Sequence, residues 1–316
     1  MEHSAHETYF SDWKLQIYQP RCRMVSLPPE IKRHITRNLS MKTLARLGQC
    51  CQSWFLFTTP ELWSRDAEEG NSFAMKWAAA HAVDDETTEI ALRILTRSST
   101  FGGQVNAIQR EFPTQHGNMT LYETSTALHH AIAIGNLRIA TRLLNMGARH
   151  DIPCSGPRWV LKATGAPWLK TRLDDFKSFY PGRYAFGQWL PLFLAFIRSD
   201  HKMAQLLISR GACRDAVLIH PNAVITTPIS ILHFAAANKN KDFDQWKFLF
   251  SSFSGYINEA CTEAHYTPLH VAMRSGNTQG MQVAVQTGAN MEAQNRALRT
   301  PLVEGVSQVP LLDQRS

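Results

Sequence analysis

Histidine and cysteine are the residue types of this chain best suited to chemistry, with thirteen histidines and six cysteines among 316 residues. Both types bind metals, and both act in proton transfer or nucleophilic attack when suitable groups lie near. The cysteines, however, lack the spacing of metal ligands, and the adjacent His129 and His130 would point in different directions on a helix. We therefore interpret the histidines as structural and the cysteines as small buried side chains in a reducing compartment.

The sequence also lacks the short motifs that mark common catalytic sites. It contains no phosphate-binding Gly-x-x-x-x-Gly-Lys loop, no Gly-x-Ser-x-Gly nucleophile turn and no His-Glu-x-x-His metal helix. We predict that the chain is not an enzyme and that it requires no metal or cofactor. Its function is then expected in surfaces that bind other macromolecules.

Charge and hydropathy narrow the choice of partners. The net charge is +7, but the basic residues are scattered, so a solvated surface or an acidic protein partner is favoured over nucleic acid. No apolar stretch is long enough to predict a membrane span, and the first residues lack the pattern of a signal peptide. The expected compartment is the cytoplasm, the nucleus or both.

A Thr-Pro-Leu-His motif carries the most specific information about the fold. It begins at Thr267, and its first three residues return 33 positions later at Thr300. Thr267 can cap a helix whose first turn contains Pro268, and His270 can bond back to that hydroxyl or across to the next unit. This motif at this period resembles the ankyrin repeat, a β-turn followed by two antiparallel helices that usually binds a protein partner.

Less regular copies of the unit precede this one. They begin at Thr126, Leu190 and Ser230. A degenerate first pair of helices is expected at 73–80 and 89–95, and the unit that begins at Thr300 is expected to be only half a repeat. About five units exceed the minimum of about three that a shared core requires.

Two turns depart from the repeat pattern. The position that precedes the motif favours glycine, but His265 stands before Thr267 and Leu298 stands before Thr300. Histidine adopts the left-handed backbone region more readily than most residues, whereas leucine does so at a real cost. We therefore expect the C-terminal turn to be remodelled or loose.

Ahead of the repeats, apolar residues recur at helical spacing. Leu27 and Pro28 lead into a first helix, one face of which carries Ile31, Ile35 and Leu39. Thr43 is the expected cap of a second helix, whose apolar stripe holds Leu44, Leu47 and Cys51. A short third helix is expected to hold Trp54, Leu56 and Phe57.

This arrangement resembles the F-box, a three-helix module that docks onto the Skp-family adaptor of cullin-RING ubiquitin ligases. The resemblance implies that the residues in contact with that adaptor are Leu27, Pro28, Ile31, Ile35, Leu39 and Leu44, with Trp54 internal. The chain departs from the family in having Thr43 where an acidic residue is common, and in the basic residues Lys32, Arg33, Arg37, Lys42 and Arg46. One alternative stays open: the helices could only cap the first repeat, which would make the chain a ligase-independent ankyrin scaffold.

An insertion lengthens the spacing between the second and third repeats by 31 residues beyond one period. This segment, 151–189, alternates aromatic and basic residues, which argues against simple disorder. Insertions in repeats often bind partners, and aromatic and arginine side chains dominate binding hot spots. The candidate substrate-binding residues are Trp159, Trp168, Arg172, Tyr180 and Tyr184, with His265 and Tyr266 from a repeat turn. Alternatively, the aromatic residues cover exposed repeat core, or, more remotely, the insertion hosts an unrecognised catalytic site.

These patterns together predict an all-α protein. We expect an N-terminal extension at 1–25, an F-box-like module at 26–66 and an irregular ankyrin array at 67–316, with the inserted loop at 151–189 and a truncated last repeat. The resemblance implies a non-catalytic adaptor of an SCF-type ubiquitin ligase. Its F-box-like module would bind the Skp-family adaptor, and its repeats would bind the protein substrate.

Overall fold

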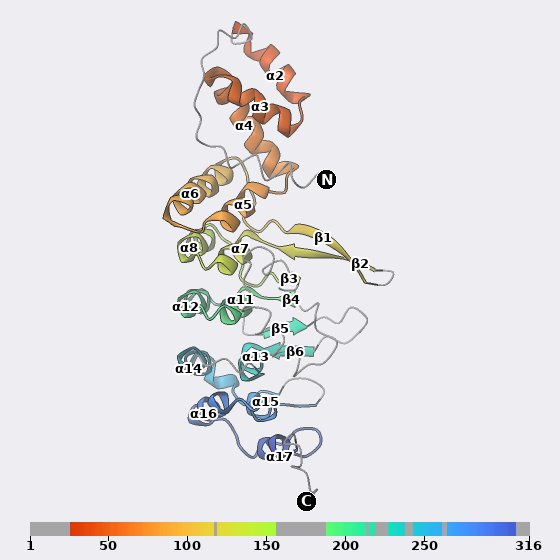
Figure 1. Ribbon diagram of the computed structural model, residues 1–316, viewed down its shortest axis with the longest axis vertical. Helices are drawn as coiled ribbons and strands as arrows, with labels where there is room; N and C mark the ends of the chain where they lie inside the picture. The colour runs from red at the N-terminus through yellow and green to blue at the C-terminus, as the bar shows by residue number, and fades with distance from the viewer. Residues whose placement is uncertain are drawn as a thin grey trace, which may run out of the picture. The chain divides into compact units, whose positions relative to one another are not determined.

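A computed structural model describes residues 26–116, 119–155, 188–212, 215–218, 227–237, 243–260 and 264–307. Helices dominate these residues, so the expected all-α class is confirmed (Figure 1). The chain divides into two compact units. The first comprises Met1–Gln109, Thr126–Ala131 and Thr141–Ala148, and the second comprises Arg110–Ser125, Ile132–Ala140 and Arg149–Ser316. Among the described helices, none has the length and apolar character needed to cross a membrane.

The first unit begins with three helices, α2 (Pro29–Arg37), α3 (Met41–Cys50) and α4 (Gln52–Glu68). The cap of α3 is Ser40 and not Thr43, because the Ser40 side chain accepts a hydrogen bond from the Thr43 backbone N–H. Helix α4 is longer than the short helix expected and continues past Pro60. Its second half buries Trp63 and Asp66, and this burial extends the helix beyond the proline.

Helices α5 (Phe73–His81) and α6 (Asp85–Thr100) follow in the first unit. They confirm the degenerate first pair of helices, although α6 begins earlier and ends later than expected. Asp84 starts α6 with a capping box, in which its side chain and that of Thr87 each bond the other residue's backbone N–H. Small side chains let α5 pack closely, since Ala74, Ala78 and Ala79 are all buried.

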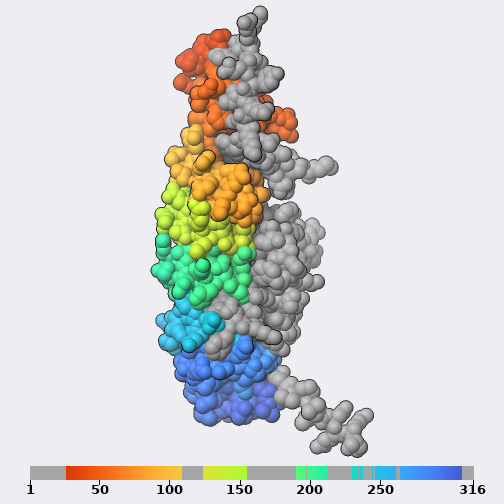
Figure 2. All heavy atoms as spheres, turned by 60° about the vertical axis from the view of Figure 1, so that its left-hand side comes forward, coloured from red at the N-terminus to blue at the C-terminus, as the bar shows by residue number. Residues whose placement is uncertain are grey.

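The remaining repeats follow the expected order of helix pairs. Helices α7 (Ala127–Ile134) and α8 (Leu137–Asn145) are divided between the two units. The second unit continues with α11 (Pro191–Ile197), α12 (His201–Ser209), α13 (Ile231–Ala237), α14 (Phe243–Ser252), the short 3-10 helix η2 (Ser254–Tyr256), α15 (Pro268–Ser275), α16 (Thr278–Gln286) and α17 (Pro301–Val306). In this unit α11, α13, α15 and α17 form one column, and α12, α14 and α16 form a second (Figure 1). The helix pairs lie next to one another in chain order, from green to blue (Figure 2).

Three two-stranded sheets occupy the turns between helix pairs of the described residues. They pair β1 (Gln109–His116) with β2 (Met119–Ser125), β3 (Cys154–Ser155) with β4 (Gln188–Trp189), and β5 (Asp215–Leu218) with β6 (Thr227–Ser230). In the second sheet Cys154 lies opposite Trp189 in antiparallel register. The two ends of the segment expected as an insertion therefore meet, and its residues 156–187 lie outside the described part of the chain.

The histidines of the repeat motif bond both within a repeat and to the next one. The Thr267 hydroxyl lies 2.9 Å from Nδ1 of His270, whose Nε2 lies 3.0 Å from the Arg299 carbonyl oxygen. His233 makes the same bond from Nε2 to the Tyr266 carbonyl at 3.0 Å. Burial lowers the pKa of His233 to about 4, so the ring is neutral at physiological pH. The structural role predicted for His270 is thus confirmed.

The turn before α17 is not remodelled, contrary to expectation. Leu298 adopts the left-handed backbone with φ 57°, and its side chain is 76% exposed. The neighbouring Asn295 braces the turn, because its Oδ1 accepts hydrogen bonds from the backbone N–H groups of Ala297 and Arg299. These bonds hold the leucine in a conformation that its side chain disfavours.

Candidate interaction surfaces

Helix α2 buries polar side chains and exposes apolar ones. Lys32 is 8% and Thr36 2% exposed, whereas Ile31 is 48% exposed. Ile35 on the same stripe is half-buried. A helix packed only against its own domain normally does the opposite and turns its apolar side inward. The apolar face of α2 is therefore left partly uncovered by the module itself.

Lysine at a buried position needs a polar partner, and α4 supplies one. Lys32 Nζ donates a hydrogen bond to Ser53 Oγ at 3.2 Å, and it lies 5.5 Å from the centre of the Trp54 ring. An ammonium group over an aromatic face gains electrostatic stabilisation. Trp54 itself is fully buried, as expected. The contact between α2 and α4 is thus partly polar and cationic.

Arg65 of α4 fixes the end of α2. Its Nη1 donates to the Leu39 carbonyl at 2.6 Å, and its Nη2 donates to the carbonyls of Thr36 and Arg37 at 2.9 and 3.1 Å. Glu61, one turn earlier in α4, accepts from Arg65 Nε at 2.8 Å. The last carbonyls of a helix lack partners within it, and a cation there also opposes the negative end of the helix dipole. Sequence reasoning missed this residue, since its partners lie 26 to 29 positions away.

The residues expected to contact the adaptor differ in accessibility. Pro28 and Ile31 are exposed, and Leu27, Ile35 and Leu39 are half-buried. Leu44 is 0% exposed, so it packs inside the module and cannot contact a partner on this surface. The spacing of the sequence placed Leu44 on an apolar helix face, but that face of α3 forms the core. We call the remaining set, Leu27, Pro28, Ile31, Ile35 and Leu39, the α2 face.

Only two of the expected substrate-binding residues lie in the described part of the chain. Trp159, Trp168, Arg172, Tyr180 and Tyr184 lie outside it. His265 is exposed at a left-handed turn position with φ 57°. Tyr266 is half-buried, and its hydroxyl donates to Glu304 Oε1 at 3.2 Å and accepts from Arg274 Nη1 at 2.9 Å. The Tyr266 hydroxyl therefore holds the repeat together, which leaves His265 as the more accessible of the two.

A buried carboxylate organises the last repeat. Glu304 of α17 is 3% exposed, and its carboxylate lies 3.5 Å from Arg274 Nη1 and 3.7 Å from Arg299 Nη1. Asn295 Nδ2 donates to its second oxygen at 3.3 Å. Burial raises the pKa of the Tyr266 hydroxyl within this group. The half repeat formed by α17 is thus attached to α15 through polar bonds that the sequence pattern did not predict.

The paired histidines of the first unit are buried. His129 is 0% and His130 4% exposed, and the His129 ring bonds the Thr126 hydroxyl at 2.8 Å. Burial lowers the pKa of His130 well below its usual value, and the nearby Lys76 adds to this effect. The ring is therefore neutral and suited to packing. Among the described residues, no three His, Cys, Asp or Glu side chains gather as metal ligands.

Comparison with known protein families matches two kinds of module to this chain. The F-box-like family model matches residues 24–67, and the ankyrin repeat model matches residues 125–155 and 265–296. No curated protein is similar enough to be a recognisable relative. Among solved structures, similarity is found to one chain of the complex described as "Bd0816 Predatory Endopeptidase from Bdellovibrio bacteriovorus in complex with immunity protein Bd3460". The identity is 16%, the match covers 74% of this chain and 91% of that chain, and the TM-score is 0.44. A likeness of this degree carries no conclusion about function.

Proposed function

We propose that this chain, an F-box-like protein with ankyrin repeats, is a non-catalytic adaptor that recruits a protein substrate to an SCF-type ubiquitin ligase. In this proposal the F-box-like module binds the Skp-family adaptor and the repeats bind the substrate. Modules of both kinds are typical of protein–protein interaction.

The orientation of α2 is the observation that supports the proposal most. The helix turns Lys32 and Thr36 inward and leaves Ile31 48% exposed, so the α2 face offers apolar surface to another protein. Complete burial of a fully exposed isoleucine is worth about 1.5–3 kcal/mol, and Ile31, which is 48% exposed, contributes about half of that when it is covered. A helix that served only as a cap for the first repeat would have its isoleucines covered, and Ile31 does not fit that alternative.

The proposed mechanism is tethering and needs no reacting group from this chain. One polypeptide that binds both ligase and substrate makes the second encounter intramolecular. The effective concentration of substrate near the ubiquitin-carrying enzyme then rises, while each separate affinity stays unchanged. The chemistry of ubiquitin transfer belongs to the other subunits of the ligase.

A pair of exposed apolar residues in the same module allows a controlled test. Ile31→Glu places a charge in the α2 face, whereas Leu56→Glu changes a residue of α4 that is 64% exposed and outside that face. Affinity for purified Skp-family adaptor, measured by calorimetry, is expected to fall about 100-fold or more in Ile31→Glu, because burial is lost and a charge is desolvated. Leu56→Glu is expected to bind like the wild type.

Two outcomes would contradict the proposal. If the wild-type chain does not bind the adaptor, or if Ile31→Glu binds as tightly as the wild type, the chain is better described as a ligase-independent ankyrin scaffold. Circular dichroism of each variant excludes unfolding as the cause of a loss. Both substituted side chains are exposed, so neither change is expected to disturb the core.

A further inference from the structure

A groove on the outward side of α6 carries two arginines that the proposed function has not used. It has a volume of about 680 Å³ and is lined by Leu92, Arg93, Thr96, Arg97, Thr100 and Phe101. We call it the arginine groove. Its lining follows two rows of residues spaced by four, 92–96–100 and 93–97, which are adjacent ridges on the helix surface, and Phe101 follows the last residue of the helix. The opposite side of α6 is the packed one, with Ala91, Ile94 and Leu95 buried.

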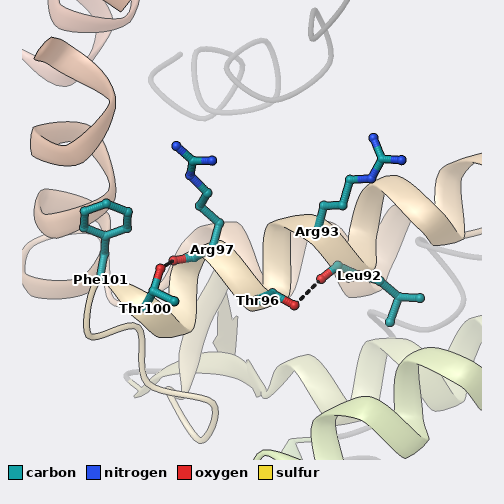
Figure 3. A pocket seen from close by; sticks show the side chains of 6 residues that line it. All are labelled: Leu92, Arg93, Thr96, Arg97, Thr100 and Phe101. Atoms are coloured by element: carbon teal, nitrogen blue, oxygen red, sulfur yellow. Dashed lines mark hydrogen bonds between the residues drawn. The ribbon is translucent and has the colours of Figure 1, made fainter. Parts of the chain in front are cut away.

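The two arginines project together from α6, with Glu89 one turn before Arg93 in the same helix. Figure 3 shows Arg93 and Arg97 extending from the same side of α6, with Phe101 beyond the end of the helix. Both arginines are exposed, and no ion pair joins either one to another residue in the described ranges. No carboxylate is found among the described residues that line the groove. Glu89 at i−4 to Arg93 and the position of Arg97 in the last turn of α6 each stabilise the helix slightly, and both guanidinium groups remain exposed to a ligand.

A third guanidinium group reaches the same helix from α8. Arg142 Nη2 donates a hydrogen bond to Thr96 Oγ1 at 3.2 Å, and that hydroxyl donates to the Leu92 carbonyl at 2.9 Å. The Thr96 side chain is thereby fixed within the groove. Arg142 of the first unit thus contacts the same helix that carries Arg93 and Arg97.

The spacing of Arg93 and Arg97 selects a particular kind of ligand. Four residues of helix rise about 6 Å, and two residues of an extended strand span about 6.6 Å. Two carboxylates at alternate positions of an extended segment therefore match the two guanidinium groups, each of which can pair with a carboxylate through two hydrogen bonds. Leu92 and Phe101 add apolar surface for a side chain between or beside the carboxylates.

We propose that the arginine groove binds an extended acidic segment of a protein partner, with a pattern of the type Glu-x-Glu and an apolar residue at x. This inference rests on the proposed function only in identifying that partner as the substrate brought to the ligase. Binding of the acidic segment itself does not depend on the Skp-family adaptor.

Fluorescence anisotropy with the full-length chain tests the groove directly. The probe is a fluorescein-labelled Gly-Ser-Gly-Glu-Leu-Glu-Gly-Ser-Gly peptide, compared with versions that carry Gln-Leu-Gln or Glu-Glu-Leu at the centre. The first comparison removes charge and the second changes only the spacing. The wild-type chain is expected to bind the Glu-Leu-Glu peptide best, with binding that weakens as ionic strength rises.

Matched double variants show whether position or total charge is responsible. Arg93→Glu/Arg97→Glu is expected to weaken binding at least about tenfold, which corresponds to about 1.4 kcal/mol. Arg33→Glu/Arg37→Glu makes the same charge change at the same helical spacing, on exposed residues of α2, and is expected to change binding less than about twofold. Arg93→Gln/Arg97→Gln, which keeps residues of good helix propensity, replaces the charge reversal if that variant fails to fold.

Three results would overturn the inference: no binding by the wild type, equal loss in both double variants, or no loss in the Arg93/Arg97 variants. The two proposals fail separately. The Arg93/Arg97 variants are expected to retain the Skp-family adaptor, while Ile31→Glu is expected to lose it and still bind the peptide. A chain that binds the peptide but not the adaptor contradicts the ligase role alone.

Discussion

Helices α2 and α15 both start with proline at the first turn, yet they bury opposite kinds of side chain. Helix α15 buries a continuous run, Pro268 to Ala272, against its own and adjacent repeats. Helix α2 buries only Lys32 and Thr36 and leaves Ile31 exposed. The difference indicates that α15 packs its apolar side against other repeats, whereas the apolar side of α2 stays partly exposed.

The two helices also differ in how they are anchored. The His270 ring at the start of α15 bonds the next repeat, and α17 is attached through the carboxylate of Glu304. Helix α2 depends on a guanidinium group at its last turn and on Lys32 over Trp54. A helix held by a few polar contacts can keep its apolar residues exposed, and four substitutions probe how the two units and their helices are stabilised.

Arg65→Ala is expected to have the largest effect on stability. It removes the hydrogen bonds to the carbonyls of Thr36, Arg37 and Leu39, of which, in the described part of the chain, only that of Thr36 still accepts from a backbone N–H, and such losses cost about 3 kcal/mol in total. The free energy of unfolding, measured with urea, should fall by that order, and adaptor affinity should fall with it because α2 loses its position. Arg33→Ala is the control, since Arg33 is an exposed arginine of α2 itself. A change below about 0.5 kcal/mol, the range of ordinary surface substitutions, would show that α2 is held by other contacts.

Asp66→Asn is expected to change how stability depends on pH. Asp66 accepts hydrogen bonds from the Ala74 N–H at the start of α5, but burial raises its pKa from 3.8 to about 6. Because the folded pKa is the higher one, its contribution is fully present below about pH 4 and is lost as pH rises through about 6. Asparagine cannot ionise, so the variant should be more stable than the wild type at pH 8 by up to about 3 kcal/mol and nearly equal at pH 4.

Asp84→Asn is expected to show the opposite dependence of stability on pH, because the pKa of Asp84 is lowered where that of Asp66 is raised. Its hydrogen bonds with Thr87 lower the pKa of the exposed Asp84 carboxyl, so its contribution is present above the usual pKa and is lost on acidification. Urea unfolding between pH 4 and pH 8 should therefore show no gain for Asp84→Asn at high pH. If Asp66→Asn gained no stability at high pH, the carboxylate of Asp66 would be well solvated or well paired.

Leu298→Gly is expected to have the smallest effect, and it concerns the last repeat. Leu298 holds a left-handed conformation with φ 57° while its side chain is 76% exposed, so removing the side chain loses little packing. Relief of the backbone strain should raise the melting temperature and stabilise the chain by about 1 kcal/mol, partly offset by the greater freedom of glycine when unfolded. Ala297→Gly is the control, because its φ is not in the left-handed region; stabilisation by both changes would contradict strain as the cause.

Much of the fold follows from local patterns. The motif at Thr267 and its weaker copies located the helix pairs, and the repeat histidines were placed correctly because their partners recur at the repeat period. Features that depend on distant or unrelated residues were missed. They include the Arg65 contacts, the Glu304 network, the burial of Leu44 and the bracing of the Leu298 turn by Asn295. The family matches to both modules agree with the resemblances found in the sequence.

Sequence alone determined that Ile31 and Ile35 share one side of a helix, because residues four apart fall on the same face, whereas Leu39, expected on the same stripe, lies beyond the helix end at Arg37. It could not determine whether that side meets the module or solvent. Only the tertiary structure decided this, since Ser53, Trp54 and Arg65 of α4 offer polar and cationic contacts to the other side of α2. Helical spacing is a property of neighbours in the chain, whereas the choice of the buried face is a free-energy balance between segments that fold together.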